Sequence, residues 1–307
     1  MTTRVLVTGA AGQVGVDLLD VLAGRLPAGG DADFQPDGRP VGVDEFDVIG
    51  VTHHELDVAD DGLVRRVLAA VRPDVVVHLA AYTAVDKAES DEATALAVNG
   101  AGTGNLSRAV ADLNAHLIAV SSDYVFDGRK GAGYVEDDPT NPLSAYGRSK
   151  LAGEQACGPR DTIVRTSWVM GVHGRNVLHV IADRVAKGQP LNFVNDQTGT
   201  ATFSADLARA LATVVRERPG GTWHVANSGV ATWHDVASAM ATLCGAPDGY
   251  VGSITTDQLT PAPAATRPTR SDLVTAKWHA RGWQALPAWR EGLERFARAA
   301  DYLRAAS

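Results

Sequence analysis

The sequence predicts an α/β fold in which helices cover both faces of a doubly wound parallel sheet, with a smaller C-terminal substrate-binding domain. Two observations lead to this prediction. Short apolar runs alternate with segments of helical periodicity through the first half of the chain, and a glycine-rich turn joins the first run to the first such segment. Strands that are apolar throughout are typical of parallel sheets buried between two layers of helices.

The individual elements of the first half follow from their periodicity. Runs of valine, leucine and isoleucine predict strands at residues 5–7, 46–51, 75–77, 117–120 and 162–164. Apolar residues spaced three and four apart predict helices at residues 13–26, 62–71, 93–113 and 144–157. Residues 27–40 are rich in glycine, aspartate and proline, which predicts a loop, and no role is evident for the wider segment 27–47.

The pattern is looser in the second half of the chain. It predicts helices at residues 177–187, 205–217 and 289–300, a strand at 223–226, and irregular structure at 260–271. We therefore expect residues 1–167 to form a dinucleotide-binding domain and residues 168–307 to bind mainly the substrate. The segment at about 195–230 is expected to return to the first domain.

Composition narrows the class of protein. The chain has 307 residues and a net charge of −8, which argues against nucleic acid as its main partner because phosphate binding needs a concentrated basic surface. No apolar run approaches the roughly 18 residues of a membrane span, and no signal-peptide pattern follows Met1, so we expect a cytoplasmic protein without a membrane partner. The cysteines, Cys157 and Cys244, have no metal-binding spacing.

The glycine-rich turn predicts a dinucleotide site, although glycines also occur in purely structural turns. Gly9 permits a tight turn after the first strand, Gly12 lets the backbone approach a pyrophosphate, and Gly15 lets helix and strand pack closely. The following helix presents its N–H groups to the same phosphates. Gln13 and Val14 lie within this turn, and the arrangement is that of a Rossmann fold.

The sequence leaves the choice between NADH and NADPH open. An acid at the end of the second strand normally holds the adenosine ribose of NAD. Here that strand ends in Val51-Thr52-His53-His54, which contains no acid and no arginine. Asp57 and Val58 are instead expected to line the adenine pocket.

A tyrosine, a lysine and a serine form the expected catalytic group. Tyr146 and Lys150 are four residues apart in a predicted helix and share one face of it. An ammonium next to a phenol, whose ordinary pKa is about 10, lowers that pKa and eases proton exchange. Ser122 follows the fourth strand, where its hydroxyl can polarise a carbonyl. A surface pair and a loop cap are the alternatives, but the ordered combination predicts hydride chemistry with NADPH or NADH.

These motifs, with several others, resemble the dTDP-4-dehydrorhamnose reductase family of extended short-chain dehydrogenases/reductases over nearly the full length. The shared motifs are Gly12-Gln13-Val14-Gly15, Ala80 to Glu89, Ser121 to Gly128, Tyr146 to Glu154, Arg165 to Val169 and Asp196 to Gly199. The resemblance implies NAD(P)H-dependent reduction of the C4 keto group of a dTDP-4-keto-6-deoxy-sugar. The expected substrate is dTDP-4-dehydro-L-rhamnose, giving dTDP-L-rhamnose, or a related deoxysugar of antibiotic pathways.

The resemblance also implies roles for individual residues. Tyr146 is the general acid, Lys150 tunes it, and Ser122 stands where the family usually has threonine. Residues implied along the cofactor are Ala81, Tyr82, Thr83 and Ser121, with Tyr146 and Lys150. Residues implied at the substrate are Ser122, Asp123, Tyr124, Val125, Trp168, Asn176 and Arg267.

Other activities on the same fold remain open at this point. A 4,6-dehydratase normally has an Asp-Glu pair after its catalytic hydroxyl, whereas Asp123 is followed by Tyr124 here. A nucleotide-sugar 4-epimerase shares the Tyr–Lys pair, and the regulatory subunit of methionine adenosyltransferase resembles the same family without catalysis. Mg²⁺ is implied by the resemblance alone, since no ligand cluster compels a metal. The sequence leaves a homodimer open.

Overall fold

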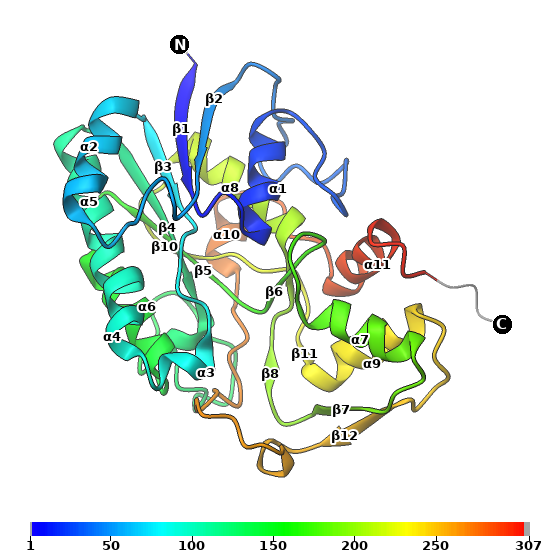
Figure 1. Ribbon diagram of the computed structural model, residues 1–307. Helices are drawn as coiled ribbons and strands as arrows, with labels where there is room; N and C mark the ends of the chain where they lie inside the picture. The colour runs from blue at the N-terminus through cyan, green and yellow to red at the C-terminus, as the bar shows by residue number, and fades with distance from the viewer. Residues whose placement is uncertain (1, 304–307) are drawn as a thin grey trace.

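The computed structural model describes residues 2–303, and in this part of the chain a six-stranded parallel sheet forms the centre of the molecule (Figure 1). Its strands, in the order β2-β1-β3-β4-β5-β10, pair in parallel throughout. Their bounds are Phe46–Val51, Thr3–Thr8, Val75–His78, His116–Ser122, Thr162–Thr166 and Gly221–His224. The parallel sheet is confirmed, and β10 begins two residues before the predicted 223–226.

The order of the strands determines where a ligand can bind. β1 lies between β2 and β3. The chain therefore runs from β1 to its neighbour on one side, β2, and then crosses to its neighbour on the other side, β3. At such a switch point the loops that follow neighbouring strands diverge and leave a crevice at their carboxyl ends. The glycine turn after β1 and Ser122 at the end of β4 therefore open onto the same edge of the sheet.

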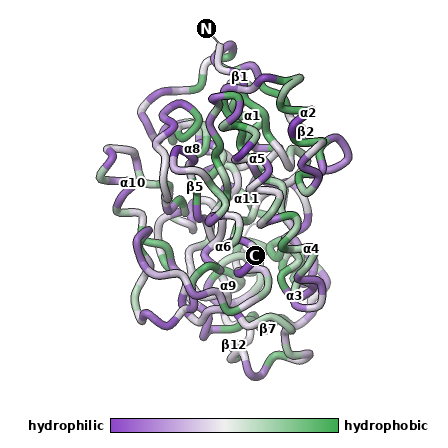
Figure 2. Tube along the Cα trace, turned by 90° about the vertical axis from the view of Figure 1, so that its left-hand side faces the viewer, coloured by the Kyte–Doolittle hydropathy of each residue, from purple (hydrophilic) through white to green (hydrophobic). Residues whose placement is uncertain are grey.

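Two layers of helices cover the sheet. α1 (Gln13–Leu22) and α8 (Ser204–Glu217) pack on the face that carries Val5 and Val7. α2 (Asp61–Val71) and α5 (Gly102–Asp112) pack on the opposite face, against Leu6, and α6 (Ala145–Ala156) lies beside α5. Because successive strand side chains point to opposite faces, one apolar strand contributes to both cores. In Figure 2 the apolar segments run through the interior of the trace.

A second hydrophobic core lies beside the sheet, and we call the segments around it the small lobe (Figure 1). It is built from α7 (Val177–Ala186), α9 (Trp233–Leu243), α11 (Trp289–Ala299) and the parallel pair β7 (Leu191–Val194) and β12 (Val251–Ile254). Short elements connect it to the rest: β6 (Val169–Met170), β8 (Thr198–Gly199), β9 (Thr202–Phe203), β11 (Ala231–Thr232) and α10 (Ala276–Ala280). α7, α8 and α11 are confirmed predictions, whereas β7, α9 and β12 were not predicted.

The helix expected at residues 93–113 is interrupted. The structure has α4 (Glu92–Ala95), a π-helical segment (Leu96–Ala101) and then α5. The wider π turn carries Asn99, which is buried. Its side chain accepts from Tyr82 N (2.8 Å) and donates to Tyr82 O (3.0 Å) and Ser149 Oγ (2.9 Å). It thus joins the loop after β3 to α6, and such π turns often occur at functional sites.

The segment after α1 is packed rather than loose. α1 ends at Leu22, four residues before its predicted end, because Gly24 adopts a left-handed φ of 73°. Further on, Arg216 of α8 pairs with Asp37 (2.9 Å) and with Glu45 (2.6 Å). Phe34 is buried in the core under α8. The loop between α1 and β2 is therefore held against α8 by the ion pairs of Arg216 and by the buried ring of Phe34.

Candidate active site

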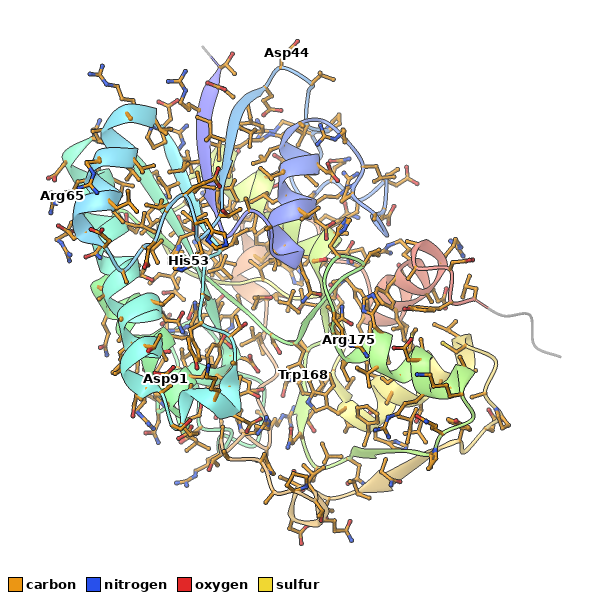
Figure 3. All side chains as sticks on the ribbon, viewed as in Figure 1. Asp44, His53, Arg65, Asp91, Trp168 and Arg175 are labelled. Atoms are coloured by element: carbon orange, nitrogen blue, oxygen red, sulfur yellow. The ribbon has the colours of Figure 1, made fainter. Side chains whose placement is uncertain are left out.

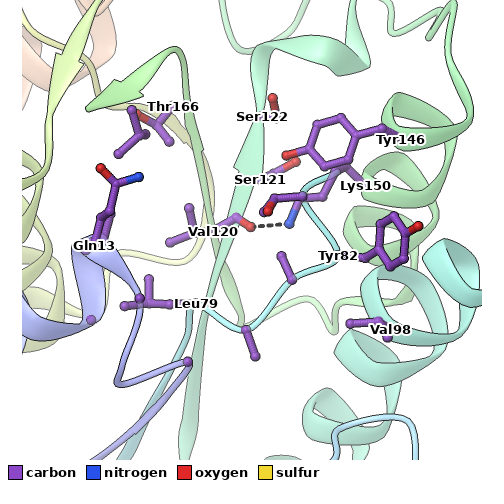
Figure 4. A pocket seen from close by; sticks show the side chains of 18 of the residues that line it. Gln13, Leu79, Tyr82, Val98, Val120, Ser121, Ser122, Tyr146, Lys150 and Thr166 are labelled. Carbon is purple, nitrogen blue, oxygen red and sulfur yellow. Dashed lines mark hydrogen bonds between the residues drawn. The ribbon is translucent and has the colours of Figure 1, made fainter. Parts of the chain in front are cut away.

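A cavity of about 960 Å³ lies at the carboxyl edge of the sheet, between the sheet and the small lobe. Most of the residues expected at the site form its wall: Gly9, Gly12, Gln13, Val14, Gly15, Asp57, Val58, Ala81, Tyr82, Thr83, Ser121, Ser122, Asp123, Tyr124, Tyr146, Lys150 and Trp168. Figure 4 shows Gln13 on one side of this space and Tyr146 with Lys150 on the other. The volume is in the range of cofactor and ligand pockets.

The glycine turn has the shape that a dinucleotide requires. Gly9 adopts φ 69°, and an added Cβ there would lie 2.7 Å from the backbone nitrogen of Ala80. A Cβ on Gly15 would lie 2.3 Å from the carbonyl oxygen of Gly9. No side chain caps the N-terminus of α1, where Gly12 occupies the N-cap position. A bare helix N-terminus on a glycine cradle fits a pyrophosphate.

The catalytic pair is held by α6. Ser144 starts this helix by accepting from Gly147 N (3.1 Å), which turns Tyr146 and Lys150 toward the end of β4 (Figure 4). Lys150 Nζ donates to the carbonyl oxygen of Val120 at 2.6 Å. Burial lowers the pKa of Lys150 to about 8. The lysine is thus fixed against the strand that carries Ser122.

The prediction that Lys150 lowers the pKa of Tyr146 is wrong for this arrangement. Burial raises the pKa of the Tyr146 phenol to about 12, hydrogen bonding to Ser122 works against that rise, and the negative charge of Asp123 adds to it. The ammonium of Lys150 is directed to Val120 instead. A phenol with such a pKa keeps its proton at neutral pH, as a proton donor must.

Asp123 lies behind the catalytic serine and is almost completely buried. Ser122 Oγ donates to Asp123 Oδ1 (3.0 Å), and Ser271 Oγ donates to Asp123 Oδ2 (2.6 Å). Burial raises the pKa of Asp123 to about 6, while these hydrogen bonds partly oppose the rise. The carboxyl group therefore joins the end of β4 to the C-terminal segment at Ser271.

This carboxyl group predicts a pH effect on stability. The folded chain keeps the Asp123 proton up to about pH 6, whereas the unfolded chain releases it near pH 4. The free energy of unfolding should therefore fall as pH rises from about 4 to about 6, by on the order of 3 kcal/mol from this group. Urea unfolding of the wild type and Asp123→Asn across this range tests the prediction. The variant should show a correspondingly smaller decrease, and identical pH profiles would contradict it.

An aromatic pair forms the small-lobe side of the cavity. Trp168 stacks on Trp233, the first residue of α9, with ring centroids 4.0 Å apart and an interplanar angle of 14°. Trp168 has a left-handed backbone (φ 46°), and an added Cβ on Gly199 would lie 2.7 Å from its ring. A left-handed backbone is strained at a residue with a large side chain, and such strain is characteristic of functional sites. Because Gly199 has no Cβ, the Trp168 ring can pack directly against its backbone.

Three expected substrate residues are not brought to the cavity wall. Val125 is fully buried and packs with Phe126 and Leu273. Asn176 caps α7 and donates to Gln13 Oε1 at 2.9 Å, so it supports a cavity residue. Arg267 forms an ion pair with Asp86 at 2.6 Å. Each of these side chains makes contacts within the protein, and a role for the three in substrate binding stays a prediction.

Other wall residues were not predicted, among them Thr52, His53, Thr166, Ser167, Arg175 and Trp233. In Figure 3, His53 lies toward α2, while Trp168 and Arg175 lie toward α7. Within residues 2–303, the buried hydroxyls of Ser121 and Thr166 have no hydrogen-bond partner in the protein, so they are available to a ligand. Thr166 ends β5, two residues beyond the strand predicted at 162–164, and the rule that ligands bind at carboxyl ends was the signal that could have found it.

Across residues 2–303, no group of three His, Cys, Asp or Glu side chains could hold a metal ion. None of the helices in that range is long and apolar enough to cross a bilayer.

Comparison with known proteins agrees with this geometry. The family model described as RmlD substrate binding domain matches residues 3–301. The dTDP-4-keto-6-deoxy-D-glucose reductase of Streptomyces niveus is 36% identical over 297 residues, covering 95% of this chain and 96% of the relative. The dTDP-4-dehydrorhamnose reductase of Streptomyces griseus is 38% identical over 299 residues, covering 94% and 91%.

A solved structure shares the whole architecture. The dTDP-4-dehydrorhamnose reductase of Bacillus anthracis str. Ames, in complex with NADP, superposes with a TM-score of 0.86. It is 31% identical in sequence, and the match covers 96% of this chain and 99% of that one. The chain therefore belongs to the dTDP-4-dehydrorhamnose reductase family and is an NAD(P)H-dependent oxidoreductase.

Proposed function

We propose that this chain reduces the C4 keto group of a dTDP-4-keto-6-deoxy-sugar, with dTDP-4-dehydro-L-rhamnose as the first substrate to test. The observation that supports this most directly is the convergence of Ser122, Tyr146 and Lys150 on one cavity with the glycine cradle. The names of the two Streptomyces relatives specify reduction of sugars of this kind.

In this proposal the protein supplies the proton and the positioning. A bound nicotinamide supplies a hydride. Gly9, Gly12 and Gly15, with the N-terminus of α1, would hold the pyrophosphate of the cofactor. The hydroxyls of Ser121 and Thr166 line the same cavity and would contact the cofactor elsewhere.

The proton follows a short path. When the sugar binds, the Ser122 hydroxyl would rotate its single proton from Asp123 to the C4 oxygen and polarise the carbonyl. Tyr146 transfers its phenolic proton to that oxygen as negative charge develops there, because the developing alkoxide is a stronger base than a phenolate even when the pKa of the phenol is raised. Lys150, whose ammonium donates to Val120 O in the cavity wall, would contact the bound cofactor from the same side.

The sugar nucleotide would be held by residues from both sides of the cavity. Asp123 and Tyr124 come from the end of β4, and Trp168 comes from the segment that enters the small lobe. We propose that residues 168–307 bind mainly this substrate, apart from α8 and β10, which belong to the sheet layer. The flat face of a tryptophan suits the apolar face of a deoxysugar.

A panel of dTDP-4-keto-6-deoxy-sugars tests the proposal. NADPH and NADH oxidation are measured with each sugar, and the C4 configuration of the product is determined by NMR. We expect one equivalent of reduced cofactor to be consumed for each sugar alcohol formed. Sugar interconversion without added reduced cofactor would assign a 4-epimerase instead. Tight cofactor binding with no turnover on any sugar would favour a non-catalytic protein.

A further inference from the structure

We propose that His173 is a positioning residue, which holds the loop 171–176 against α1 through Asp17 and so controls how fast the dinucleotide enters and leaves. The loop joins β6 to α7 of the small lobe, whereas α1 is the helix that begins at the glycine cradle. The inference rests on the dinucleotide site of the proposed function. It concerns the rate at which the cofactor exchanges rather than the contacts that bind it.

The first argument is the position of the loop 171–176. Gly174 and Arg175 form part of the wall of the cavity that contains the glycine cradle. Gly174 lies against the first residue of α1, because an added Cβ there would be 3.2 Å from Gln13 Cγ. Asn176, at the other end of the loop, donates to Gln13 Oε1 at 2.9 Å. A dinucleotide on the cradle would therefore be enclosed between this loop and the sheet.

The second argument is a buried carboxyl group with one free oxygen. Asp17 follows Gln13 by one turn on the same face of α1 and is fully buried. Its Oδ2 accepts from Ser204 Oγ, at the start of α8. Its Oδ1 has no hydrogen-bond partner within residues 2–303, and His173 Nε2 lies 3.6 Å from it. Because an unsatisfied buried acceptor is costly, a small movement of the imidazole that completes this bond is favoured.

The charges around Asp17 make His173 its partner. Burial raises the pKa of Asp17 to about 6, whereas the hydrogen bond from Ser204 and the charge of His173 oppose that rise. The carboxyl group is therefore ionised at neutral pH and needs a donor at Oδ1. The two neighbouring carboxylates, Asp20 and Asp206, repel this charge and raise the pKa further. The imidazole N–H of His173 is the donor that the loop brings to this oxygen.

His173 acts through the loop rather than on the cofactor. Its side chain is absent from the cavity wall, unlike its neighbour Gly174. The loop is also seated at its first residue, because an added Cβ on Gly171 would lie 2.9 Å from Ser204 Cβ. His173 thus holds the middle of a loop whose two ends already rest on α8 and α1. Such a contact adds to the barrier for opening the loop, so its loss should speed both entry and exit of the dinucleotide.

The experiment measures the association and dissociation rates of NADPH by stopped-flow fluorescence. His173→Phe removes the N–H donor, and we expect both rates to rise by about tenfold, the value of one hydrogen bond to a charged group, with a smaller change in Kd. His173→Gln keeps an N–H donor at similar reach and should restore the wild-type rates. In an Asp17→Asn background, His173→Phe should have a much smaller effect. His234→Phe is the matched control, because His234 Nε2 donates to Val251 O at 3.2 Å within the small lobe.

The outcomes separate this inference from the proposed function. Exchange rates of His173→Phe equal to those of the wild type and of His234→Phe would overturn the inference and leave the reductase intact. A faster dissociation with an unchanged association rate would also overturn it, because that result indicates a direct contact with the cofactor. Circular dichroism checks the fold, and His173→Ala gives the same test with a smaller side chain if the phenyl ring disturbs the loop. Failure of the wild type to bind NADPH or NADH would contradict the proposed function itself.

Discussion

Replacement of Tyr146 by phenylalanine is expected to lower kcat for keto-sugar reduction by about 10²- to 10⁴-fold, the usual contribution of a positioned general acid. Phenylalanine keeps the ring that meets Tyr124 edge to face, with centroids 5.5 Å apart, so the cavity wall should persist. The substitution removes only the phenolic hydroxyl group, and with it the proton that is transferred. Single-turnover reduction with the variant saturated in NADPH measures the chemical step, and NADPH binding should be unchanged.

Tyr134→Phe provides the control for loss of a tyrosine hydroxyl. The Tyr134 hydroxyl donates to Asp127 Oδ1 at 2.9 Å, and this residue is not part of the cavity wall. Its removal should leave the rate of reduction unchanged. If Tyr146→Phe turned over as fast as this control, the proton would have to come from another group, and Ser122 would be the first to test.

Substitution of Gly15 by alanine is expected to weaken dinucleotide binding by about 100-fold. The new Cβ would lie 2.3 Å from the Gly9 carbonyl oxygen and 2.8 Å from the Ala10 carbonyl carbon, both of which are backbone atoms. The turn must open to relieve the overlap, and strain of roughly 3 kcal/mol corresponds to this loss of affinity. Titration with NADPH measures the effect.

Gly62→Ala is the matched glycine variant. Gly62 lies in the first turn of α2, and an added Cβ would meet only the Arg66 and Asp60 side chains, at 3.3 Å. The variant should bind NADPH like wild type and gain up to about 1 kcal/mol in the free energy of unfolding. Circular dichroism of both variants separates loss of the cradle from loss of the fold. Normal binding by Gly15→Ala would contradict the assignment of the cradle.

Local patterns were sufficient for the sheet and for much of the cavity. The strand predicted at 75–77 is found as β3, one residue longer, because a buried parallel strand is an unbroken apolar run. Tyr146 and Lys150 share a wall because a spacing of four is one turn of a helix. Ser122 lies at the edge because β4 ends there. Each of these inferences needs only residues that are close together in the sequence.

Features that depend on distant residues could not be predicted in this way. β7 and β12 pair although α8, α9 and several short strands lie between them in the sequence, so neither four-residue run is distinctive alone. Trp233 reaches the cavity only because α9 packs in the small lobe. The ion pair of Arg267 with Asp86 joins residues far apart in the sequence, so the local pattern could not reveal it. The pKa of Tyr146 likewise depends on burial, which the spacing of two residues does not reveal.

The path of the chain limits how such proteins can be recombined. β10 joins the sheet next to β5, although α7 and β7 of the small lobe lie between them in the sequence. The chain then returns to the small lobe for α9, and Trp278 of α10 is again buried in the core of the sheet. A chimaera with one crossover after residue 167 would keep the small-lobe core from one parent but would combine two parents in the core between the sheet and α8. Transplanting sugar preference between relatives therefore calls for exchange of individual wall residues rather than of a C-terminal half.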